Sequence, residues 1–195
     1  MTEVGVLALQ GDFAAHGAAL RGAGAEPREV RRIGDLDGLT GLVLPGGEST
    51  TLLHLMGDEP WFEALRRFHD DGGALFGTCA GAILLARQVV PDQRSLGLLD
   101  VVVERNAYGR QAESFEARVE TDGGAGTLEA LFIRAPRIRN VGPGVETLAG
   151  IDGEPVLVRQ GRVLAATFHP ELTTSLGLHR LFVGMARVPG RTRCA

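Results

Sequence analysis

A cysteine enclosed by small residues is the strongest chemical feature of the sequence, in the motif GTCAG around Cys79. An apolar run precedes the motif and an apolar, helix-like segment follows it, which is the setting of a nucleophile elbow. Such a turn forces unusual backbone angles at the nucleophile, and flanking glycines relieve the crowding. The start of the following helix favours thiolate over thiol, and the Ala80 amide is placed to stabilise an oxyanion. The alternative is a structural cysteine, because free cysteine is commonly buried in cores.

A cysteine nucleophile also needs a base and a group that orients the base. His169 is the best candidate for the base because it directly follows an expected strand, 163–168, and ligands bind at strand ends in such sheets. Glu171 is close enough to reach back to the imidazole and fix its tautomer. The alternative for this His-Pro-Glu turn is a helix cap with a satisfied histidine. The remaining histidines lie in expected helices and are expected at the surface or partly packed: His16, His54, His69 and His179.

The motif LPGGEST, which begins at Leu44, also follows an expected buried strand. Its two glycines let the backbone approach a ligand, so amides near Gly46 and Gly47 can form the second half of an oxyanion hole. Glu48 and Ser49 are candidates for contact with an amino-acid substrate. The alternative is an ordinary strand-to-helix turn with a serine cap. Phosphate binding is disfavoured, because no lysine follows the glycines.

Short apolar strands alternate with helices in the first half of the chain, which predicts a doubly wound, mostly parallel α/β sheet with helices on both faces. The second half reads as successive strands with turns between them, so we expect an antiparallel extension of the sheet. The expected strands are 4–9, 28–30, 41–44, 74–77, 101–104, 115–119, 131–133, 156–159 and 163–168. The expected helices are 13–23, 49–56, 60–71, one that follows GTCAG and ends near 86, and 174–187. We expect a single domain, 1–187, and a frayed tail, 188–195.

All 20 basic residues are arginines, so the chain contains no lysine. A Schiff base, a pyridoxal phosphate aldimine and a Walker A loop each require lysine, and the sequence therefore excludes all three. A base composition that favours arginine codons explains the bias more simply than any function does.

The charge and the cysteine content narrow the choice of partner and compartment. A net charge of −4 does not indicate a basic surface that would bind nucleic acid or an anionic membrane. No apolar run approaches the ~20 residues that a membrane span needs, and the N-terminus does not resemble a signal peptide. Two cysteines, Cys79 and Cys194, make a poor disulfide framework, which favours the cytoplasm.

Taken together, the motifs resemble the class I, triad-type glutamine amidotransferases. LQG, LPGGEST, GTCAG and FHPEL carry the resemblance to the class. ERNAYGRQ from Glu104 and FIRAP from Phe132 resemble, more specifically, the glutaminase subunits of pyridoxal 5′-phosphate synthase. The similarity runs from Val4 to about Arg187. The chain departs from the family after LQG, where the usual pattern is close to AVxEH and this sequence has DFAAH, which keeps only His16.

The resemblance implies a flavodoxin-like three-layer fold and a catalytic triad of Cys79, His169 and Glu171. It also implies an oxyanion hole from Gly47 and Ala80. The glutamine site that it implies is lined by Gly47, Glu48, Ser49, Arg105, Ile133 and Arg134.

Free glutamine carries an α-carboxylate and an α-ammonium, and a selective pocket needs charged partners for both. Arg105 and Arg134 are the candidates for the carboxylate, and Glu48 is the candidate for the ammonium. Without the resemblance, the default for Arg105 is a structural ion pair with a neighbouring carboxylate such as Glu104.

The implied reaction is hydrolysis of L-glutamine to glutamate and ammonia through a Cys79 thioester, with no metal and no organic cofactor. The resemblance implies that the ammonia passes to a (β/α)₈-barrel synthase subunit, which builds pyridoxal phosphate from a pentose phosphate and a triose phosphate in a large hetero-oligomer. The glutaminase is then expected to be weak alone and active when docked. Two alternatives remain: a glutaminase for a different synthase, as in histidine or purine biosynthesis, and a non-catalytic regulatory module.

Overall fold

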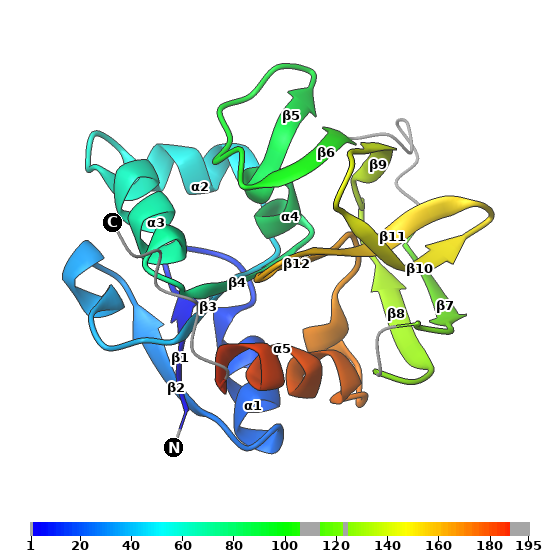
Figure 1. Ribbon diagram of the computed structural model, residues 1–195, viewed down its shortest axis with the longest axis horizontal. Coiled ribbons are helices and arrows are strands. Elements are labelled where there is room, and N and C mark those ends of the chain that lie inside the picture. Colours follow the sequence, from blue (N-terminus) through cyan, green and yellow to red (C-terminus); the bar gives the residue numbers. More distant parts are fainter. Residues whose placement is uncertain (1, 106–113, 123–124, 188–195) are drawn as a thin grey trace.

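A central sheet of seven strands organises the chain, in the order β10-β11-β12-β4-β3-β1-β2 (Figure 1). The computed structural model describes residues 2–105, 114–122 and 125–187, so the expected tail at 188–195, with Cys194, lies outside the described residues. The five strands from β12 to β2 are parallel, whereas β10 and β11 add antiparallel pairing at one edge. The predicted mostly parallel sheet with an antiparallel extension is confirmed. The strands are β1 Glu3–Leu7, β2 Glu26–Val30, β3 Gly41–Leu44, β4 Ala74–Thr78, β10 Glu146–Ile151, β11 Glu154–Gln160 and β12 Val163–Ala166.

Helices cover both faces of this sheet, as predicted (Figure 1). On one face lie α1, Phe13–Gly22, and α5, Gly177–Arg187. The other face is covered by α2, Ser49–Met56, α3, Trp61–Asp70, and α4, Ala80–Leu85. Successive side chains of β4 point to opposite faces, so Leu75 packs in the core beneath α2 and α3 while Phe76 packs in the core beneath α5.

Two small sheets lie beside the central one. The first joins β5, Ala86–Val90, β6, Leu99–Glu104, and β9, Arg137–Val141, and the second joins β7, Phe115–Val119, to β8, Leu128–Phe132. Short 3₁₀ turns, η1 at Ile33–Leu36 and η2 at Pro170–Leu172, complete the described elements. The strands β5, β9 and β10 were not predicted. Each lacks the continuous apolar run of a central strand and is held by backbone pairing with a neighbour, which sequence periodicity does not reveal.

No helix in the described parts of the chain is long and apolar enough to cross a membrane.

The turn that follows β4 packs directly on β3. A Cβ added at Gly81 would lie 1.9 Å from the carbonyl oxygen of Leu44, a backbone atom that cannot move without disturbing the sheet. We therefore expect Gly81→Ala to lower the free energy of unfolding by about 3 kcal/mol in urea denaturation. Gly184→Ala is the matched control, because Gly184 is a helical glycine in α5 with no atom within 4 Å of the added Cβ. That variant should be neutral or up to about 1 kcal/mol more stable, and equal losses in both would contradict the packing argument.

Candidate active site

Cys79 lies in a tight strand-to-helix turn between the end of β4 at Thr78 and the start of α4 at Ala80. Its φ is +46°, an unusual angle for a residue with a side chain, and this is the geometry that the elbow interpretation requires. A Cβ on Gly77 would come within 2.5 Å of the Gly81 carbonyl carbon, so the turn closes only with small residues on both sides. Cys79 is a free cysteine, 6% exposed, at the mouth of the sheet.

His169 follows β12 and is held by a buried carboxylate. Its Nδ1 lies 2.7 Å from Oε1 of Glu171, which belongs to η2 and whose side chain has no exposed surface. The backbone amide of His169 donates to the Leu131 carbonyl at 2.8 Å, which anchors the histidine to β8. Since a carboxylate only accepts, Nδ1 carries the proton in this contact. The other ring nitrogen, Nε2, is then the one available to Cys79.

The protonation of His169 reflects both of its neighbours. Burial alone would lower its pKa, but hydrogen bonds and charges from Cys79 and Glu171 outweigh that effect and raise the pKa to about 10. The imidazolium is therefore the stable form of His169 near neutral pH. A cysteine and a protonated histidine in this arrangement can act as nucleophile and proton donor.

The loop after β3 brings backbone close to both groups. A Cβ on Gly46 would lie 2.4 Å from Cε1 of His169. One on Gly47 would lie 2.4 Å from Oε1 of Gln10, and the φ of Gly47, +141°, is one that residues with a side chain rarely adopt, so both positions favour glycine. Gln10 also accepts a hydrogen bond from the Glu48 amide at 3.3 Å. Gln10 therefore holds the loop. The motif LQG contained the residue, but sequence reasoning gave it no role.

A cavity of about 370 Å³ opens above Cys79, within the size range of small-molecule sites. It brings together Cys79, His169 and all six residues expected to bind substrate, whereas Ala80 and Glu171 lie outside its lining. The lining consists of Gln10, Gly11, Asp12, Gly47, Glu48, Ser49, Cys79, Ile83, Arg105, Ile133, Arg134, Pro136 and His169. Arg105 follows β6, and Ile133 and Arg134 follow β8, so strand ends from the small sheets complete a site begun by the central sheet.

Glu48 and Arg134 form an ion pair across this cavity, with 2.7 Å between Oε1 and a guanidinium nitrogen. Arg134 adopts a φ of +45°, which directs its side chain from the end of β8 toward the loop after β3. The pair offers opposite charges side by side. A zwitterionic ligand can replace this ion pair by placing its ammonium against Glu48 and its carboxylate against Arg134. Each charge of the pair then keeps an opposite charge beside it.

Gln93 connects two other residues of the site. Its Oε1 accepts hydrogen bonds from Ser49 Oγ at 2.9 Å and from the Arg105 guanidinium. Glu104 pairs with Arg139 instead, so among the described residues Arg105 does not form the expected ion pair with Glu104. Sequence reasoning missed Gln93, which lies in a loop with no motif around it.

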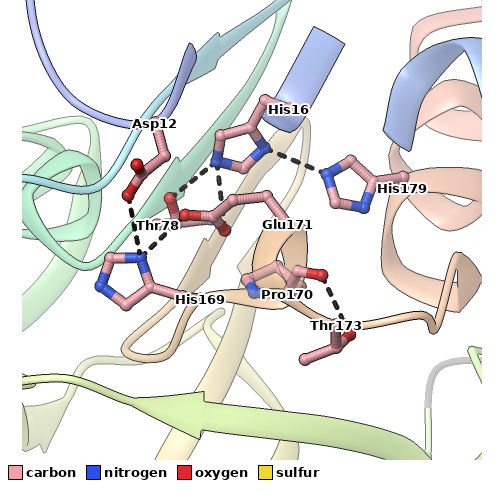
Figure 2. A network of polar contacts seen from close by, with 8 residues as sticks. All are labelled: Asp12, His16, Thr78, His169, Pro170, Glu171, Thr173 and His179. Atoms are coloured by element: carbon pink, nitrogen blue, oxygen red, sulfur yellow. Dashed lines mark hydrogen bonds and ion pairs between the residues drawn. The ribbon is translucent and has the colours of Figure 1, made fainter. Parts of the chain in front are cut away.

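Two histidines are placed differently from the expectation. His54 is exposed and His69 is partly buried, but His16 and His179 have no exposed surface. Figure 2 shows His16 between His179 and the Glu171 carboxylate. The expectation was wrong for these two because α1 and α5 pack on the same face of the sheet and turn them inward. The signal was present in the sequence, since His16 precedes the core residue Leu20 by one helical turn.

A metal ion would compete with the triad for its ligands. Asp12, His169 and Glu171 have donor atoms within 4.8 Å of one another. Yet His169 and Glu171 already hydrogen-bond each other, and Asp12 Oδ2 lies 4.0 Å from His169 Nδ1 with its side chain half exposed. The described residues therefore favour the use of this cluster in orienting the histidine.

Comparison with known proteins identifies close relatives over nearly the whole chain. Residues 6–187 match the model of the SNO glutamine amidotransferase family. The pyridoxal 5′-phosphate synthase subunit PdxT of Thermus thermophilus is 55% identical, covering 95% of this chain and 98% of that protein. The same subunit of Deinococcus radiodurans is 53% identical, over 94% of this chain and 96% of that protein. A crystal structure of a glutamine amidotransferase superposes with a TM-score of 0.89 at 53% identity, covering 95% of this chain and 99% of that chain. The resemblance noted in the motifs is confirmed.

Removing the Cys79 sulfur should lower the pKa of His169. Cys79→Ala deletes a hydrogen bond and a negative charge that together hold the pKa near 10, so we expect the His169 ring signals to titrate at a clearly lower pH in NMR.

Because the raised pKa of His169 lies above its value in the unfolded chain, the protonated ring stabilises the fold fully below about pH 6.5. That stabilisation disappears as the pH rises toward 10. The wild-type protein should therefore lose stability relative to the variant over this interval.

The exposed His54 on α2 provides the internal control, because its ring signals should be the same in both proteins. A His169 titration that is unchanged by Cys79→Ala would contradict the assigned contact between the two side chains.

Proposed function

The chain belongs to the SNO glutamine amidotransferase family, and from that premise we propose that it is the glutaminase subunit of a pyridoxal 5′-phosphate synthase. It hydrolyses L-glutamine to L-glutamate and supplies the ammonia to a synthase partner. The observation that carries the proposal is the array of Cys79, His169 and Glu171 beside a cavity whose lining includes two carboxylates and two guanidinium groups. Relatives above 50% identity that bear this name favour this synthase over those of histidine or purine biosynthesis.

In the proposed mechanism the Cys79 thiolate attacks the side-chain carboxamide carbon of glutamine, and a carbon–sulfur bond forms as the carbonyl oxygen becomes an oxyanion. The amides of Gly47 and Ala80 stabilise that oxygen. Support comes from the position of Ala80 directly after the nucleophile and from the close approach of the Gly46-Gly47 backbone, where a Cβ added at Gly46 would lie 3.4 Å from Cys79 Cβ.

His169 then acts as acid and base in turn. The imidazolium donates its Nε2 proton to the departing nitrogen, the carbon–nitrogen bond breaks, and ammonia leaves a γ-glutamyl thioester on Cys79. The neutral ring next takes a proton from water, which attacks the thioester carbonyl and releases glutamate and the thiolate. Glu171 keeps Nδ1 protonated throughout, so Nε2 alone exchanges protons with the reacting groups.

Charged groups at the rim of the cavity select the amino-acid part of the substrate. Glu48 binds the α-ammonium, and Arg134 or Arg105 binds the α-carboxylate, while Ser49 and Ile133 complete the pocket. The ion pair between Glu48 and Arg134 supports this role, because both partners face the same space with opposite charges. A site that supplies a charged partner for each end of the amino acid discriminates against ligands that lack one of those groups.

The partner is a (β/α)₈-barrel synthase in a large hetero-oligomer, and the reaction takes place in the cytoplasm, where a reducing environment keeps the free Cys79 thiol available. A single glutaminase domain, 1–187, releases the ammonia, and the partner consumes it. The product therefore moves to the partner without any cofactor in this chain.

Replacing Cys79 by Ala should separate the two half-reactions. In the reconstituted complex, we expect the variant to lose glutamine-dependent formation of pyridoxal phosphate by at least about 10³-fold, because no nucleophile remains. Synthesis from added ammonium should persist at the wild-type rate, which absorbance of the product measures. The exposed Glu63→Gln on α3 is the control and should leave both activities intact. Loss of both activities in Cys79→Ala would contradict the role assigned to this chain.

Docking of the synthase should increase glutamine hydrolysis. The family to which the chain belongs implies a glutaminase that is weak alone and active when docked. We expect a glutamate-release assay to show at least about tenfold higher kcat/KM with the purified partner present. Hydrolysis by the isolated chain at the full rate of the complex would exclude this coupling.

A further inference from the structure

A row of buried polar side chains continues behind the triad, on the face of Glu171 that points away from His169 (Figure 2). Oε2 of Glu171 lies 3.3 Å from Nε2 of His16, which also lies 3.1 Å from Oγ1 of Thr78. On the other edge of its ring, His16 Nδ1 is 3.0 Å from Nε2 of His179. Residues from β4, η2 and α5 thus meet around the ring of His16, which belongs to α1.

The contacts select one tautomer for each ring. A carboxylate oxygen at 3.3 Å repels a nitrogen lone pair, so His16 must present a proton on Nε2. That proton is donated to Thr78 Oγ1, and its positive end also attracts Oε2 of Glu171, which accepts no hydrogen bond from the described residues. Nδ1 of His16 is then an acceptor, and His179 donates to it from Nε2. This leaves the unprotonated Nδ1 of His179 without a hydrogen-bond partner among the described residues, which is the less costly arrangement because this nitrogen is an acceptor and not a donor.

Both rings are kept uncharged by their surroundings. Burial is the main cause that holds the pKa of His16 well below its usual value, and the nearby rings of His179 and His169 add to it. Burial likewise lowers the pKa of His179 to about 4. Phe76 packs edge-on against both rings, with its ring centroid 6.1 Å from that of His16 and 5.9 Å from that of His179. Its side chain shields the two imidazoles from water. The negative charge of Glu171 therefore remains available to His169.

We propose that His16 is a positioning residue of the glutaminase, which aims the Glu171 carboxylate at His169 through its Nε2 proton and is itself oriented by His179. The inference rests on the proposed function, since it assigns a role within that site. His169 has a second carboxylate within reach, the half-exposed Asp12, with 4.0 Å between Oδ2 and Nδ1. Glu171 holds the ring in preference to Asp12 because His16 Nε2 attracts Oε2 at 3.3 Å, which leaves Oε1 turned toward Nδ1 of His169 at 2.7 Å.

Two substitutions of His16 distinguish positioning from packing. His16→Leu removes the donor, and we expect kcat for glutamine in the complex to fall by about 10- to 100-fold with KM unchanged, as for partners that orient a functional histidine. His16→Gln retains an N–H near the position of Nε2 and should recover kcat to within about threefold of wild type. Equal impairment of a folded Leu and a folded Gln variant, or no loss in the Leu variant, would overturn the proposal.

Phe182→Leu is the matched control for packing, because Phe182 lies on α5 and contacts Phe76 with ring centroids 5.4 Å apart but carries no polar atom. It should lower stability and leave kcat unchanged. If it lowers kcat as much as His16→Leu does, packing alone explains the loss and the positioning role is rejected.

Alkylation of Cys79 by iodoacetamide gives a readout that needs neither glutamine nor the synthase. His16→Leu should shift the pH dependence of the alkylation rate constant, because His169 then loses its fixed orientation toward the sulfur, while His16→Gln should retain the wild-type profile. If the wild-type complex fails to hydrolyse glutamine, the proposed function is wrong, and the alkylation profiles still decide the inference. Identical profiles for all three proteins would overturn it.

Nitrogen NMR of the histidine rings tests the same idea without any substitution. In the wild-type chain, His16 should show a protonated Nε2 and an unprotonated Nδ1 at neutral pH. The opposite tautomer, or a doubly protonated His16, would remove the donor to Glu171 and overturn the assignment.

Discussion

The hydrogen bond between Glu171 and His169 is the interaction on which the rest of the site depends. A buried carboxylate costs several kcal/mol unless it is paired, and Glu171 is paired through Oε1, which accepts a hydrogen bond from His169, while Oε2 lies 3.3 Å from His16 Nε2. In return, the carboxylate fixes the tautomer of His169 and contributes to the high pKa of its ring. The short η2 turn makes this geometry possible, because it places Glu171 beneath the histidine that follows β12.

The other residues of the site lie close together because they follow strands that end at the same edge of the fold. In the central sheet, β3, β4 and β12 are parallel neighbours, so the segments that follow them emerge at one edge. These segments carry the glycine loop, Cys79 and His169. The small sheets add Arg105 after β6 and Arg134 after β8. The catalytic residues therefore follow strands of the central sheet, whereas the two arginines expected to bind the substrate carboxylate follow strands of the smaller sheets.

The charged groups at the bottom of the cavity, around Cys79, are more buried than the two at its opening, Glu48 and Arg134. At the floor, Cys79, His169 and Glu171 are buried, and the contacts of His169 with its two neighbours raise the pKa of its ring to about 10. At the rim, Glu48 and Arg134 are about half exposed, so their attraction is screened and each can exchange its partner at low cost. This difference suits a site in which the reacting groups stay fixed and the recognition groups rearrange.

Local patterns in the sequence determined the order of the main elements, the elbow at Cys79, the histidine that follows β12 and the family resemblance. These features depend on neighbours in the chain: apolar periodicity, and glycines where backbone passes too close for a Cβ. Tertiary structure alone decided which polar side chains meet. His16 and His179 are 163 positions apart, and they touch only because α1 and α5 pack on one face of the sheet. Gln93 between Ser49 and Arg105, and Glu48 against Arg134, are further pairs of this kind. The energy of a buried polar group depends on what surrounds it in space, and residue type and spacing do not specify those surroundings.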